Sequence, residues 1–309
     1  MNPFASGPQT HSQTDLTTKA LVPLVTFLRT DERPRRQKES DGRRAEHPGG
    51  ADMERNYRAD NPANYSKRNR WSYNNEMGRY RTEKQLTFIR NHLPGEGLRI
   101  LDIGGGDGRL SVPLATSGHK VTVLDVAATA LKNLAAEGHP SIECVHSDIL
   151  SFATQRHFDA AIAVDSIKYM THASLERLFS KINGLLAERG VFMFAEMNTN
   201  SWRNHFRVWL GRDFRPYRIG SHLGYASALR EAGFEVAAMS GFSWMPVAFN
   251  SNSRFVRLFQ RLEEVLNLHS WISQSPWLLV AARKNGHPAP CPERNSRSAV
   301  LPVALSAEA

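Results

Sequence analysis

The chain of 309 residues is 41% hydrophobic and 22% charged, a composition typical of one large or two small globular domains. No stretch approaches the roughly 20 apolar residues that cross a bilayer. The 2 cysteines are far apart in the chain and cannot build a disulfide framework or a zinc site. We therefore expect no metal and a cytoplasmic location. The net charge of +9 comes from the segments that flank residues 85–200, because residues 85–200 hold 10 basic and 12 acidic side chains. Residues 201–284, in contrast, hold 11 basic and 5 acidic side chains.

Both ends of the chain have the composition of disordered segments. Residues 1–60 and 285–309 are rich in proline and serine, and they cannot bury enough apolar surface to offset chain entropy. Met53 is an alternative start within the first of these segments. The alternating pattern between the two ends predicts one domain over residues 61–284.

Helical and strand patterns alternate along this domain. Helical spacing is found at residues 76–92, 109–117, 127–136, 174–186, 225–231 and 254–268. Apolar runs predict strands at residues 98–103, 120–124, 142–145, 158–164, 191–195, 234–240 and 277–282. The alternation predicts an α/β fold, a doubly wound, mostly parallel Rossmann-like sheet of these seven strands with helices on both faces.

The last predicted helix, residues 254–268, is strongly amphipathic. Its apolar side chains share one face, and they are Phe255, Leu258, Phe259, Leu262, Val265 and Leu266. An apolar stripe of this kind usually faces a protein core. We therefore expect this helix to bury that face against the rest of the domain.

Glycines directly follow the first predicted strand, at residues 104, 105, 106 and 108. A loop without Cβ atoms lets a ligand approach the backbone, and the first amides of the next helix point at that ligand. The first strand of an open parallel sheet commonly lies at the switch point, where ligands bind. A dinucleotide fingerprint needs a glycine where Arg109 stands, and the Gly-Lys-Ser/Thr of a Walker loop is absent, so neither motif is present.

The pattern Asp-x-Gly-x-Gly-x-Gly over residues 102–108 resembles motif I of the class I S-adenosylmethionine-dependent methyltransferases. Three acidic residues stand after later strands as they do in that family, Asp125 after the second, Asp148 after the third and Asp165 after the fourth. Residues 185–191 are similar to the family's entry to the fifth strand, with Glu188 and Arg189 in place of proline and glycine. The resemblance covers residues 76–200.

The resemblance implies that S-adenosyl-L-methionine is the cofactor and that residues 76–200 bind it. It places Asp102, Gly104 and Gly106 around the methionine moiety, Asp125 at the ribose, Asp148 and Ile149 at the adenine, Asp165 near the sulfonium and Tyr80 as a lid. Val126 is a further expected cofactor-binding residue. Two of these residues have an alternative interpretation. Asp125 could instead cap the next helix, and Tyr80 could be a core-facing aromatic residue.

Methyl transfer from a sulfonium is an in-line displacement, for which an enzyme chiefly supplies alignment and desolvation. A general base is needed only if the acceptor is a hydroxyl or a protonated amine. His172 and His205 are the candidate bases, and His222 lies in the same part of the chain as His205. The alternative for His172 is a histidine at a helix start without a catalytic role.

The acceptor is expected to bind to residues 201–275. The Asn/Asp-Pro-Pro-Tyr/Phe signature of transfer to planar nitrogens is absent after the fourth strand, which favours a small molecule over nucleic acid. Residues 202–217 interleave aromatic side chains with arginines, which suits an acceptor lid or a peripheral membrane contact. The sequence does not indicate an oligomeric state.

These features together predict a methyltransferase that acts on an oxygen of a small lipophilic or saccharide biosynthetic intermediate. The basic flanks leave a second hypothesis, an RNA methyltransferase. A third is a non-catalytic protein that keeps the fold and binds a partner.

Overall fold

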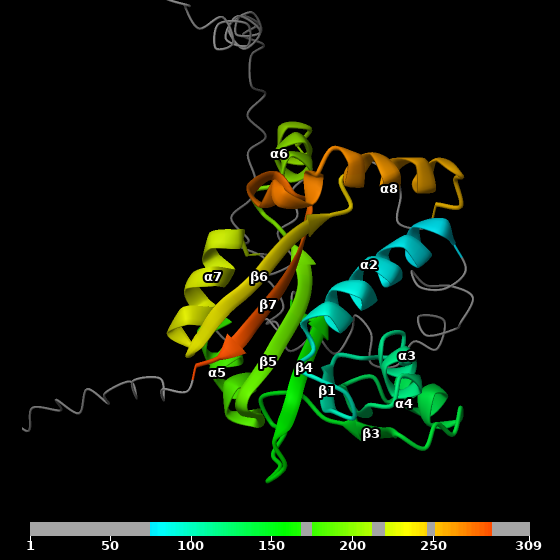
Figure 1. The fold of residues 1–309 in the computed structure, drawn as a ribbon, viewed down its shortest axis with the longest axis vertical. Helices are drawn as coiled ribbons and strands as arrows, with labels where there is room; N and C mark the ends of the chain where they lie inside the picture. Colours follow the sequence, from blue (N-terminus) through cyan, green and yellow to red (C-terminus); the bar gives the residue numbers. More distant parts are fainter. Residues whose placement is uncertain (1–74, 168–174, 212–219, 246–250, 286–309) are drawn as a thin grey trace, which may run out of the picture. The chain divides into compact units, whose positions relative to one another are not determined.

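The computed structural model of the chain describes residues 75–167, 175–211, 220–245 and 251–285, and Figure 1 shows how their elements are arranged. Residues 1–60 and 286–309, for which disorder is predicted, lie outside these ranges. Among the residues that the structure describes, no helix has the length and apolar character needed to span a bilayer.

One sheet of seven strands forms the centre of the domain, in the order β3-β2-β1-β4-β5-β7-β6. The strands are β1 (Arg99–Ile103), β2 (Lys120–Asp125), β3 (Ile142–His146), β4 (Phe158–Val164), β5 (Leu186–Met197), β6 (Phe234–Phe242) and β7 (Trp277–Lys284). β7 is antiparallel to both β5 and β6, and the pairs from β3 to β5 are parallel. The predicted fold class is therefore confirmed, and the strand order reverses between β1 and β4, which makes the carboxyl ends of these strands the switch point.

Helices cover both faces of the sheet (Figure 1). They are α2 (Glu76–His92), α3 (Ser111–Thr116), α4 (Ala128–Ala135), α5 (Leu175–Leu185), α6 (Trp202–Trp209), α7 (His222–Glu231) and α8 (Phe255–Val265), with the short 3-10 turns η3 (Leu268–Ser270) and η4 (Ile272–Gln274). The apolar residues of α5 and α7 pack in one core cluster, and those of α2, α3 and α4 pack in a second. Successive side chains of the central strands point alternately into one cluster and the other, so both faces of the sheet are buried.

The predicted burial of the apolar face of α8 is wrong. The buried residues of this helix are Val256 and Glu263, whereas Phe255, Leu258 and Val265 are 64%, 50% and 80% exposed. The physical reason is that α8 packs against α2 through its polar side, beyond the edge of the sheet, where Lys84 pairs with Glu264 at 2.6 Å. Helical periodicity identifies the apolar face of a helix and leaves open what covers it.

Candidate active site

The glycine loop after β1 has a backbone that glycine alone adopts easily. Gly104 and Gly106 have φ angles of 74° and 58°, in the left-handed region. A Cβ atom on Gly104 would lie 2.6 Å from the Cβ of Ser166, whereas one on Gly106 would find its nearest neighbour, a carboxylate oxygen of Asp125, at 3.9 Å. The loop therefore packs tightly against the end of β4 at Gly104, and at Gly106 it leaves room for a ligand above the backbone.

Asp125 stands at the end of β2 and is held beside this loop. Its Oδ2 accepts a hydrogen bond from the amide of Gly106 and its Oδ1 accepts one from the amide of Ala127, each at 2.8 Å. The second contact is with Ala127, which is itself the N-cap residue of α4, and α4 begins without a side-chain capping hydrogen bond. The first contact fixes the carboxylate at the glycine loop, and a carboxylate has acceptor capacity left for further donors after two such bonds.

The residues after β3 lie next to Asp125, because the amide of Ser147 donates to the Asp125 carbonyl at 3.2 Å. Asp148 is half-buried and accepts from the amide of Leu150 at 2.7 Å. The side chain of Ile149 is buried in the core, so only the backbone of this residue is available to contact a ligand. Val126, in contrast, has an exposed side chain.

Asp102 lies under the glycine loop. It is 2% exposed, and its Oδ2 accepts a hydrogen bond from the hydroxyl of Ser111 on α3. A Cβ atom on Gly105 would come within 2.7 Å of the same carboxylate oxygen. Burial raises the pKa of Asp102 to about 6. The side chain therefore supports the loop from within the fold.

Asp165 follows β4 and forms an ion cluster with two arginines. Nη2 of Arg81, on α2, bonds to both carboxylate oxygens of Asp165 at 3.0 Å, and Nη2 of Arg109 lies 3.6 Å from one of them. The guanidinium of Arg81 also stacks 4.2 Å above the ring of Trp277. Asp165 has a φ of 60°, an uncommon angle for a side-chain-bearing residue and one that clusters at functional sites.

This cluster adds residues that the sequence analysis did not predict. Two guanidinium groups and one carboxylate next to a glycine loop match the two charges of an α-amino acid, its carboxylate and its ammonium. Arg81 escaped prediction because it is 84 positions from Asp165 and no short motif joins them. Arg109 could have been found, since it replaces the glycine of a dinucleotide loop with a cation.

The structure describes two of the remaining predicted residues, Tyr80 and His205. Tyr80 is buried, and its hydroxyl donates to Glu263 of α8 and accepts from the amide of Ser243 at 3.0 Å. His205 is exposed on α6, and His172 lies outside the described residues. The structure thus brings together the residues at the ends of β1, β2 and β4, and it places Tyr80 in the contact between α2 and α8.

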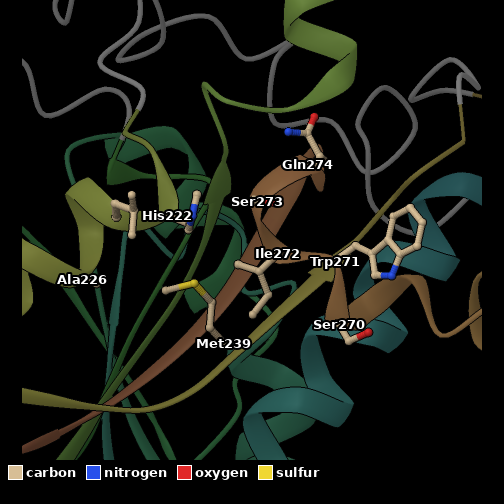
Figure 2. A pocket seen from close by; sticks show the side chains of 9 residues that line it. His222, Ala226, Met239, Ser270, Trp271, Ile272, Ser273 and Gln274 are labelled. Atoms are coloured by element: carbon tan, nitrogen blue, oxygen red, sulfur yellow. The ribbon is translucent and has the colours of Figure 1, made fainter. Parts of the chain in front are cut away.

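A cavity of about 540 Å³ lies between α7 and the η3–η4 segment. Figure 2 shows His222 and Ala226 on α7 facing Met239 of β6 and Ile272 of η4. Nδ1 of His222 is buried without a hydrogen-bond partner among the described residues. The cavity is near the β6 edge, whereas the glycine loop follows β1, which is separated from β6 by three strands.

Comparison with known proteins shows which families and structures the chain is similar to. The model of a methyltransferase domain matches residues 100–190. The ubiquinone biosynthesis O-methyltransferase of Paramagnetospirillum magneticum is 27% identical over 191 residues, which cover 53% of this chain and 75% of that protein. Its namesake from Rhodopseudomonas palustris strain TIE-1 is 29% identical over 122 residues, 38% of this chain. The match spans about half (47%) of the length of the latter.

The solved structures to which the chain is similar include named methyltransferases. The N-methyltransferase NodS from Bradyrhizobium japonicum, in complex with S-adenosyl-L-homocysteine, has a TM-score of 0.49 and 18% identity. The alignment covers 71% of this chain and 93% of that structure.

Proposed function

Because the chain contains a class I S-adenosylmethionine-dependent methyltransferase domain, we propose that it transfers a methyl group to an oxygen atom of a small lipophilic acceptor. One observation carries the cofactor half of this proposal, the contact of 2.8 Å between the Asp125 carboxylate and the Gly106 amide at the switch point of the sheet. The acceptor half is supported by relatives whose names specify O-methylation. The saccharide acceptor has no comparable support.

The residues around the loop fit this cofactor. The open space above Gly106 admits a ligand to the backbone, and the carboxylate beside it can accept hydrogen bonds from the ribose hydroxyls. Val126 would cover the adenine from its exposed position, with Asp148 and the backbone of Ile149 at the edge of the base. Tyr80 has no place in this set, because its hydroxyl is bound within the α2–α8 contact.

The methionine end of the cofactor would lie at the ion cluster. Arg81 and Arg109 would hold its carboxylate and Asp165 its ammonium, while Asp102 supports Gly105 from below. When bound, the cofactor supplies a methyl group that its sulfonium already activates. The chain's own contribution is to align the acceptor oxygen behind that methyl group and to exclude water.

The proton of an acceptor hydroxyl needs a base, for which His172 and His205 remain candidates. His205 is exposed on α6, so it would reach the acceptor only if the acceptor binds at that helix. Two further predictions belong to the same proposal, a cytoplasmic location and a membrane contact through residues 202–217. A lipophilic acceptor would reside in a bilayer, and the enzyme would reach it from the cytoplasm.

Calorimetry with S-adenosyl-L-homocysteine tests the cofactor half. Asp125→Ala should weaken binding by roughly 10- to 100-fold, because it removes charged hydrogen bonds worth about 1.5–3 kcal/mol. Asp159→Ala is the matched control, since Asp159 also accepts from a backbone amide, that of Arg99 at 2.8 Å, but at the amino end of β4. An equal affinity of wild type and Asp125→Ala would remove the role of Asp125, and no binding by the wild type at millimolar ligand would overturn the proposal.

Methyl transfer from labelled cofactor tests the acceptor half. The panel would comprise a catechol with a long alkyl chain, unsubstituted catechol, a saccharide and a transfer RNA. We expect transfer to the alkylated catechol at the highest kcat/KM. Transfer to the saccharide or to RNA alone would contradict a lipophilic acceptor.

A further inference from the structure

The domain exposes an apolar surface at the carboxyl edge of the sheet. Six large side chains make up this surface, which we call the outward face, and they are Phe206, Trp209, Phe255, Leu258, Val265 and Trp271. Each is at least half exposed, from 50% for Leu258 to 80% for Val265. Scattered apolar side chains are ordinary on a protein surface, but a set gathered on neighbouring helices marks an interaction site.

The helices that carry the outward face converge on one short segment. Arg203 of α6 donates to the carbonyl of Ser243 at 3.2 Å, and the amide of Trp244 donates to Glu263 of α8 at 2.7 Å. The ring of Trp271 packs edge-on against Trp244, with the centroids 6.4 Å apart. Because residues 243 and 244 are adjacent, α6, α8 and Trp271 all contact the same short segment.

Buried polar contacts hold α8 in this orientation. Glu263, 5% exposed, receives hydrogen bonds from Tyr80 of α2 and from Trp244, and Lys84 of α2 pairs with Glu264. Turning the apolar face inward would take the Glu263 carboxylate away from these donors. The fold therefore presents the apolar face to the outside.

The charges around the outward face select among possible occupants. Arg254 and Arg261 are exposed on α8, and Arg257 is exposed but pairs with Glu76 of α2 at 3.1 Å, while the acidic residues of α8 are turned to α2. A second copy docked by the same face would bring arginines against arginines. A nucleic acid would pair with the arginines and leave the apolar side chains in water.

We propose that the outward face docks on an anionic lipid bilayer, with α6 and α8 lying in the headgroup region. Aromatic and aliphatic side chains on one side and arginines at their border are what an interfacial helix needs for such a contact. The inference deepens the proposed function by naming the place from which the acceptor comes, and it makes α8 a second anchor beside α6. The docking itself does not depend on the chemistry of the acceptor.

Flotation of the full chain with lipid vesicles tests this inference. Wild type should float with vesicles of phosphatidylcholine and phosphatidylglycerol, weakly with phosphatidylcholine alone, and less as salt is raised. The double variant Leu258→Glu/Val265→Glu should lose at least about tenfold in partitioning, because it removes two apolar contacts and repels the lipid charge. Lys132→Glu, an exposed change on α4, alters the net charge by the same two units and should bind as wild type.

Two outcomes would overturn the proposal, no flotation of wild type and equal flotation of the double variant. Light scattering on wild type and double variant adds an independent check. A wild-type dimer that becomes a monomer in the double variant would show that a second copy covers the face. Transfer to unsubstituted, water-soluble catechol should be unchanged in the double variant, so a failure of docking is distinguishable from a failure of the proposed chemistry.

Discussion

Asp102 is a buried carboxyl group beneath the glycine loop. Burial raises its pKa from 3.8 to about 6, so the folded chain holds this proton more tightly than the unfolded chain does. The free energy of unfolding therefore falls as the pH rises from about 4 to about 6, and the cost is fully present above that range. At about 1.4 kcal/mol for each unit of pKa, the cost at neutral pH is about 2–3 kcal/mol.

Asp102→Asn removes this ionisation. We expect the variant to gain stability relative to wild type as the pH rises, by about 2 kcal/mol between pH 4 and pH 7.5, with any loss of the Ser111 hydrogen bond appearing as a constant offset. Urea unfolding of both proteins at several pH values in this range measures the difference. A difference that is flat with pH would contradict a raised pKa.

The glycine loop could be located from the sequence at the residue scale, while the ion cluster could not. The glycines and Asp125 follow one another within a short stretch, so their spacing alone indicates a ligand at the strand ends. Tyr80 and Arg81 are neighbours on α2, and successive helical side chains point about 100° apart. Tyr80 turns to α8 and Arg81 to Asp165, and only the packing of α2 decides which of them reaches the site.

At the scale of elements, the contact between α2 and α8 depends on one buried carboxylate. Burial raises the pKa of Glu263, and the hydrogen bond from Tyr80 opposes that rise. Tyr80→Phe removes this donor and leaves a buried charge with one partner fewer. We expect the free energy of unfolding at pH 7.5 to fall by about 2 kcal/mol. The loss should shrink at lower pH, where Glu263 is protonated in the variant.

Tyr225→Phe is the matched control for this change. The hydroxyl of Tyr225 is also buried, but its partners are the neutral amide of Gly220 at 2.9 Å and the carbonyl of Met197 at 3.4 Å. Its loss should cost about 1 kcal/mol, with little dependence on pH. Urea unfolding of both variants checks the comparison. Equal losses would mean that the Tyr80–Glu263 pair is no stronger than a neutral hydrogen bond.

Elements were predictable where a pattern is local. β4 begins and ends as predicted, because its apolar run is bounded by polar residues. β5 begins at Leu186, five residues before the predicted start at residue 191, because it pairs with Phe158 across an irregularity that includes Arg189 at a φ of 62°. The exposure of α8 depends on its partner, α2, which is far away in the sequence, and no local pattern contains that information.

At the scale of the whole domain, α2 joins the two strand ends that border the switch point. Arg109 of the cofactor loop donates to Thr82 and Gln85 of α2, at 3.1 and 2.6 Å, and Arg81 of α2 bonds to Asp165 after β4. A ligand between these strand ends stabilises the loop directly. Through the arginines it should also stabilise a helix that precedes the sheet in the chain.

Hydrogen exchange with and without saturating S-adenosyl-L-homocysteine tests this coupling. We expect slower exchange in residues 103–110 and in α2, and little change in α5, which packs on the other face of the sheet. Arg81→Lys keeps the charge but loses the planar guanidinium that bonds to Asp165 and stacks on Trp277, so protection should shrink in α2 and persist in the loop. Arg79→Lys, an exposed change on the same helix, should behave as wild type. Protection confined to the loop in the wild type would contradict this coupling. Arg81 would then hold the methionine end of the cofactor without any gain in the stability of α2.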